Sequence, residues 1–302
     1  MTNVPFIQLK PTAQRLRASV LPAWERAYDA CEFVGGPSVA RLEAELAARL
    51  HVKNALACAN GTDAILIALQ AGGVGPGTRV AMPNLTFWAT YEAAAQLGAT
   101  PVLIDTDETL QMSYAEFTAA WEKHRFEAAV LVHLMGWATP ELARFRAFCR
   151  ERKILLVEDG AQSFGVEVAG RPVFAGAQIS TLSFYPAKVI GGCMDGGAIL
   201  TDDPVLAATA KTLCNHGRAA HYSYSHVGWN SRMGGMQAIY LLEFLAAFDE
   251  ILADRRRTEA RYLEAAAGWS GVTVHRAPDG VRGNAYLSVL TCPDPAALAD
   301  RL

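Results

Sequence analysis

Apolar residues between about positions 38 and 245 follow two alternating patterns, one with helical spacing and one with short unbroken runs. Ser38–Leu50 carries an apolar residue roughly every 3.6 positions, which predicts an amphipathic helix. Unbroken runs such as Ala128–His133 and Ile154–Glu158 predict strands that are buried on both faces. The same patterns predict further helices over 62–71, 88–97, 140–153 and 204–213, and further strands over 55–58, 79–82, 100–104, 179–185 and 198–201.

This alternation of buried strands and helices predicts an α/β fold with a mostly parallel central sheet and helices on both faces. Ligands of such sheets bind beyond the carboxyl ends of the strands. Candidate chemistry is therefore expected directly after five strand ends. These are Cys58, Met82, His133, Glu158 and Tyr185.

The pattern changes in the last quarter of the chain. Residues 236–266 predict one long helix, or two abutting helices, that connects a large domain to a smaller one. Beyond them we expect one strand over Ala285–Leu290 and a helix that begins at Pro295. We therefore expect a large domain with an N-terminal arm over 1–245, and a connector helix with a small, shortened C-terminal domain over 246–302.

Composition and charge exclude several classes of protein. The 302 residues are 51% hydrophobic and 19% charged, which is typical of a globular protein and not of a disordered one. The net charge of −3 comes without a basic stripe, so no nucleic-acid partner is expected. Because no run of about 18 apolar residues occurs and the first residues lack a secretory leader, we expect no membrane partner and a cytoplasmic location.

Cysteine and histidine spacing does not favour a metal site. The six cysteines are scattered and form no C-x-x-C pair, which favours free thiols. His216, His221 and His226 are spaced by five residues, which suits neither a helix face nor a strand face. No metal is therefore expected.

Two of the strand ends carry residues suited to binding an anion or a planar ligand. Asn60-Gly61-Thr62 opens a helix, where unpaired amides and the helix dipole attract a phosphate, although the same residues also suit a plain helix cap. Phe87 or Trp88 could offer a ring face to a planar ligand or pack in the core.

Two other strand ends carry residues suited to catalysis. Asp159 ends a hydrophobic strand, where a carboxylate needs a charged or hydrogen-bonded partner, unless it caps the next helix. Lys188 lies between an apolar strand and a glycine turn. That position suits a nucleophilic amine as well as a surface lysine.

The order and spacing of these segments identify a resemblance that covers about residues 33 to 262. The chain resembles the DegT/DnrJ/EryC1/StrS aminotransferases, fold-type-I enzymes that use pyridoxal 5′-phosphate to aminate keto sugars. The segments that carry the resemblance are Phe33–Pro37, Asn60–Ala64, Thr86–Thr90, Glu158–Ser163, Ser183–Lys188, Asp195–Ala198, Asn215–Gly217 and Gly228–Met233.

The resemblance implies roles for residues around the cofactor ring. Lys188 would form the Schiff base with pyridoxal phosphate and shuttle protons during the reaction. Asp159 would pair with the pyridinium nitrogen, which keeps that nitrogen protonated. Gln162 would lie near the 3-hydroxyl group, and Phe87 would stack on the ring.

The resemblance also implies how the phosphate is held and how the chains assemble. Gly61, Thr62 and Ser183 would hold the phosphate. Asn230 would reach the phosphate of a neighbouring subunit, which implies a homodimer with shared active sites.

The implied reaction moves an amino group from glutamate or glutamine to a keto sugar, expected to be nucleotide-linked, or to a keto cyclitol. A keto substrate that is not a sugar remains an alternative, as does a non-catalytic or regulatory relative that keeps the fold. A related group of sugar dehydratases has histidine in place of the reactive lysine, so Lys188 disfavours that reading.

Overall fold

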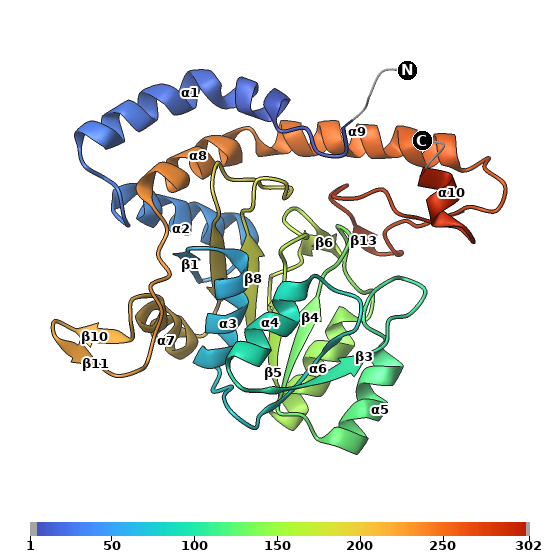
Figure 1. Cartoon of the computed structure of the whole chain (residues 1–302), viewed down its shortest axis with the longest axis horizontal. Helices are drawn as coiled ribbons and strands as arrows, with labels where there is room; N and C mark the ends of the chain where they lie inside the picture. The colour runs from blue at the N-terminus through green and yellow to red at the C-terminus, as the bar shows by residue number, and fades with distance from the viewer. Residues whose placement is uncertain (1–4, 300–302) are drawn as a thin grey trace.

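The computed structural model describes residues 5–299, so the ends of both expected domains, 1–4 and 300–302, lie outside it. Seven strands form the central sheet, in the order β1-β9-β8-β5-β4-β2-β3 (Figure 1). All of them run in one direction except β9, which is antiparallel to both of its neighbours. The strands are β1 (Asn54–Cys58), β2 (Arg79–Pro83), β3 (Thr100–Ile104), β4 (Ala128–Val132), β5 (Leu155–Asp159), β8 (Ile179–Ser183) and β9 (Gly197–Thr201).

Helices cover both faces of this sheet, as the apolar strands require. One face packs on α2 (Pro37–Leu50), α5 (Tyr114–His124), α6 (Leu142–Arg152) and α8 (Gly235–Ala246). The other packs on α3 (Gly61–Ala71), α4 (Trp88–Gln96) and α7 (Pro204–Cys214). Consecutive strand residues alternate between the two cores, so that Val130 belongs to one and Leu131 to the other. The predicted mostly parallel α/β sheet is confirmed.

The first helix of the chain, α1 (Lys10–Asp29), and helix α5 are not predicted by the sequence pattern above. The 236–266 segment forms two abutting helices, since α8 ends at Ala246 and α9 (Phe248–Ala266) begins after Ala247. Within residues 5–299, no helix has both the length and the apolar character needed to cross a bilayer.

The chain after α9 folds back beside the sheet (Figure 1). Its first short strand, β12 (Thr273–Val274), pairs with its last, β14 (Leu290–Thr291). Its middle part adds β13 (Val281–Arg282) to the hairpin of β6 (Glu167–Val168) and β7 (Arg171–Pro172). It ends in α10 (Pro295–Ala299), which begins where predicted. A second small hairpin, β10 (Arg218–Ala220) and β11 (Ser223–Tyr224), lies near α7.

The strand predicted over Ala285–Leu290 is wrong. Ala285 has a φ of +56°, which is incompatible with a strand, and only Leu290 belongs to one. Tyr286 instead packs against the hydrophobic core. Tyr286 reaches the core from a bend in the chain, so burial of its side chain does not require an extended backbone.

Candidate active site

The carboxyl ends of β1, β2, β4, β5 and β8 meet at one edge of the sheet, because these strands run in the same direction. The antiparallel strand β9 lies between β1 and β8 without disturbing this arrangement. The sequence-predicted residues that follow these strands are thus brought to a common edge.

Two backbone amides that have no acceptor in the described part of the chain lie where α3 begins. The Asn60 side chain accepts a hydrogen bond from the Asp63 amide at 2.8 Å, so the predicted helix cap is present. Within residues 5–299, however, the amides of Gly61 and Thr62 have no hydrogen-bond acceptor. A Cβ on residue 61 would come 2.7 Å from the Cβ of Ser183. Glycine therefore allows β8 to approach the helix start, and the amides with the Ser183 hydroxyl form a cradle for a phosphate.

Asp159 is buried at the end of β5. Burial raises the pKa of its carboxyl group, and the nearby amide of Ala161, the Lys188 ammonium, His133 and the Thr90 hydroxyl partly oppose that rise. The Ala161 amide donates to the Asp159 carboxylate at 2.9 Å. A charged group such as a protonated pyridine nitrogen would stabilise the ionised form of this buried acid further.

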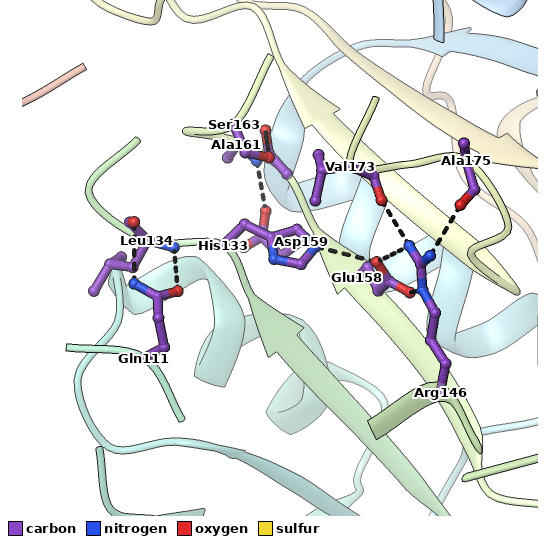
Figure 2. A network of polar contacts seen from close by, with 11 residues as sticks. Gln111, His133, Leu134, Arg146, Glu158, Asp159, Ala161, Ser163, Val173 and Ala175 are labelled. Carbon is purple, nitrogen blue, oxygen red and sulfur yellow. Dashed lines mark hydrogen bonds and ion pairs between the residues drawn. The ribbon is translucent and has the colours of Figure 1, made fainter. Parts of the chain in front are cut away.

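The preceding residue, Glu158, lies in a different setting. Arg146 donates two hydrogen bonds to its carboxylate, at 2.7 and 2.8 Å, and His133 Nε2 lies 3.1 Å from it. Figure 2 shows Glu158 between Arg146 and His133, while the Asp159 carboxylate is directed to Ala161. Although burial raises the pKa of Glu158, the bonds to His133 and Arg146 outweigh it, so the pKa lies below its ordinary value.

Lys188 lies in the turn after β8. Its amide donates to the Tyr185 carbonyl at 2.8 Å, which fixes the turn. Its ammonium is near enough to influence the Asp159 carboxylate, and it lies 5.3 Å from the ring centroid of Tyr286. The structure thus brings the predicted lysine and the predicted acid together.

Gln162 and Phe87 occupy the rim of this site. The Gln162 side chain accepts a hydrogen bond from the Met135 amide at 2.7 Å, which links the loops after β4 and β5. Phe87 directly precedes α4 and is 68% exposed as a residue, so it does not pack in the core. Its carbonyl accepts from the amide of Thr90, the residue whose side chain reaches Asp159.

Asn230 is not joined to this group. Its side-chain oxygen accepts two hydrogen bonds from Arg232, at 2.6 and 3.1 Å, and its backbone bridges Asn215. Asn230 is exposed.

Four residues at the site were not predicted as functional: Thr90, His133, Asn284 and Tyr286. Thr90 belongs to the Thr86–Thr90 segment and His133 follows β4, so the sequence held a signal for both. Asn284 and Tyr286 follow none of the five predicted strand ends and belong to no segment of the resemblance, so the sequence did not indicate a role for them.

The sequence model described as the DegT/DnrJ/EryC1/StrS aminotransferase family matches residues 15–302. The chain belongs to this family. It is therefore an aminotransferase, and the predicted fold and resemblance are confirmed.

Two relatives of similar sequence are named for different functions. A dTDP-3-amino-3,4,6-trideoxy-alpha-D-glucose transaminase of Streptomyces venezuelae is 36% identical over 273 residues, 89% of this chain and 71% of that protein. A protein of Geobacillus stearothermophilus named pleiotropic regulatory protein is 34% identical over 270 residues, 88% of this chain and 72% of that protein.

Solved structures agree with this assignment. S. venezuelae DesV, in complex with a ketimine intermediate, has a TM-score of 0.95 and 32% identity, with 99% of this chain and 81% of that chain covered. A Bacillus subtilis protein called ntda, with the bound cofactor PMP, has a TM-score of 0.87 and 26% identity, with 99% and 69% covered. The cofactor of the family is pyridoxal 5′-phosphate, and the cradle at Gly61 with the buried acid Asp159 fits such a group.

Proposed function

We propose that this aminotransferase moves an amino group from glutamate or glutamine to a keto sugar linked to a nucleotide. The observation that carries the proposal is the grouping of Lys188, Asp159 and the Gly61 cradle at one sheet edge. The acceptor class is supported by relatives named as transaminases of dTDP- and UDP-linked sugars. A keto cyclitol or another keto compound could accept the amino group by the same chemistry and is the alternative acceptor.

Each site residue has a proposed task. Pyridoxal phosphate, when bound, supplies an electron sink that stabilises negative charge on the substrate carbon. Lys188 Nζ would hold the cofactor, and its amine would carry a proton from and to the substrate carbon. Asp159 holds the proton of the pyridine nitrogen.

The remaining proposed residues orient the cofactor. The amides of Gly61 and Thr62 and the hydroxyl of Ser183 hold the phosphate. Gln162 would turn its side-chain NH₂ group toward the cofactor, since its Oε1 accepts the hydrogen bond of the Met135 amide. The exposed ring of Phe87 stacks on the cofactor ring.

A homodimer with shared sites is proposed as well. The side-chain oxygen of Asn230 accepts from Arg232, and Asn230 is exposed, which leaves it accessible to a second copy. Three further large side chains are exposed in the single chain and would be buried by a partner: Trp88, Tyr185 and Met194. The division into residues 1–245 and 246–302 and the cytoplasmic location remain proposals.

The first experiment is an absorbance scan of purified protein with pyridoxal phosphate and then with L-glutamate. We expect the visible band of lysine-bound cofactor, which glutamate then shifts to the shorter-wavelength band of the aminated cofactor. Borohydride followed by mass spectrometry should place the label on Lys188, and Lys188→Ala should carry none.

Two other outcomes would change the proposal. A band that glutamate and glutamine leave unshifted would exclude these donors. No lysine-bound cofactor in the wild-type chain would favour a non-catalytic role, for which the regulatory name of the Geobacillus stearothermophilus relative is the supporting observation.

A further inference from the structure

The ring of Tyr286 faces the ammonium group of Lys188, although the two residues lie far apart in the sequence. The Nζ atom is 5.3 Å from the ring centroid, which is within the range of a cation–π contact. The Lys188 ammonium is also near enough to the Asp159 carboxylate to lower the pKa of that acid. The lysine thus has an acid at the strand edge and an aromatic ring of the C-terminal segment as neighbours.

A buried asparagine fixes the position of this ring. The Asn284 side-chain amide donates to the carbonyls of Gln162 and Phe164 at 2.8 and 2.9 Å, and its backbone amide donates to the Gly136 carbonyl at 3.0 Å. Its side-chain oxygen accepts from the Tyr286 amide at 3.0 Å. Asn284 therefore ties the backbone of Tyr286 to the loops after β4 and β5, which carry the proposed cofactor contacts.

The backbone around this contact adopts unusual conformations. Ala285 has a φ of +56°, and Gly136 has a φ of +100°. A Cβ on residue 136 would come 2.4 Å from Asn284 Oδ1 and 2.8 Å from Tyr286 Cβ. Left-handed residues other than glycine persist only where surrounding contacts hold them, and they gather at functional sites.

A second contact comes from helix α9. Arg255 Nη2 donates to the Tyr286 carbonyl at 3.2 Å. Tyr286 is thus held from two sides by its backbone, which leaves the ring as the part that faces Lys188.

We propose that Tyr286 is a positioning residue for Lys188: the face of its ring binds the protonated amine and covers it from water. This inference rests on the proposed role of Lys188 as the reactive amine. Binding through the ring face does not need the phenol hydroxyl, so phenylalanine should replace tyrosine and leucine should not.

The test uses the full-length chain without cofactor. Brief acetylation with acetic anhydride near neutral pH, followed by mass spectrometry, gives the rate at Lys188 relative to the exposed Lys53 of the same chain. Tyr286→Leu, Tyr286→Phe and a control at the exposed Tyr262 of α9, Tyr262→Leu, are compared.

We expect Tyr286→Leu to accelerate acetylation of Lys188 by about 2- to 30-fold, which is the range of a cation–π contact. Tyr286→Phe and Tyr262→Leu should match the wild type. An unchanged rate in Tyr286→Leu would overturn the proposal, and so would an equal change in Tyr286→Phe. Because no cofactor or substrate is present, the result does not depend on whether the proposed amino transfer occurs.

Discussion

Glu158 and Asp159 are consecutive residues at the end of β5, and the protein shifts the pKa values of their carboxyl groups in opposite directions. Side chains of consecutive strand residues point to opposite faces of a sheet. Glu158 therefore meets Arg146 and His133 on one side, whereas Asp159 is buried on the side of Thr90 and Lys188. Glu158 is thus hydrogen-bonded by charged and polar side chains of its own chain, whereas a cationic ligand would further stabilise the ionised form of Asp159.

Glu158→Gln should destabilise the protein by about 3–5 kcal/mol at neutral pH, since it leaves the buried charge of Arg146 with a weaker partner. The lowered pKa of Glu158 means that its stabilising contribution is present above the ordinary value of 4.5 and is lost as the pH falls through the lowered pKa. In Glu158→Gln, the free energy of unfolding should therefore fall less steeply as the pH is lowered through this range. Urea unfolding at a series of pH values measures both effects.

A matched control is Glu151→Gln, which removes the exposed partner of Arg152. Its free energy of unfolding should change by less than about 1 kcal/mol. If both variants lost stability equally, the buried ion pair would not be the cause.

Asp159→Asn should retain cofactor but reduce kcat for amino transfer by about 10²- to 10³-fold, because the pyridine nitrogen loses its charged partner. Burial raises the pKa of Asp159, so its ionised form costs stability above the ordinary value of 3.8. The neutral variant should therefore be at least as stable as the wild type near pH 7. A near-normal rate, measured with full cofactor occupancy, would remove Asp159 from the proposed role.

Gly61→Ala should weaken binding of pyridoxal phosphate by about 5- to 150-fold, since an added methyl group at a tight contact costs about 1–3 kcal/mol. The contact is with Ser183, one of the proposed phosphate ligands. Gly75→Ala is the matched control, because a Cβ there meets nothing within 4 Å. Titration of the cofactor-free chains gives both dissociation constants, and equal values for the two variants would contradict the cradle.

Mixing two inactive variants tests the shared site. Lys188→Ala and Asn230→Ala should each be inactive or weak alone, whereas an equal mixture refolded together should recover about a quarter of wild-type activity, because half of the dimers are hybrids with one complete site. The site with an intact Lys188 then receives Asn230 from the other chain. No recovery, with hybrid dimers demonstrated, would mean that Asn230 acts within its own chain or not at all.

Local patterns in the sequence were sufficient to predict much of the fold and of the candidate site. The runs Ala128–His133 and Ile154–Glu158 are buried strands because their apolar residues need cover on both faces, a property of each segment by itself. The direction of parallel strands then brings Asp159 and Lys188 to one edge without knowledge of the loops. Their proposed roles came from the resemblance and await the experiments above.

Only the tertiary structure decided the contacts between distant segments. No hydrophobic period in the sequence predicts that β9 lies antiparallel between β1 and β8. The same is true of the Glu158 contact with Arg146 and of the position of the Tyr286 ring beside Lys188. The Ala285–Leu290 segment shows why: its apolar residues predict a strand, but the hydrogen bonds of Asn284 to Gln162, Phe164 and Gly136 impose a turn. The spacing of apolar residues shows which side of a segment is buried. Which other segment covers that side depends on packing across the whole chain.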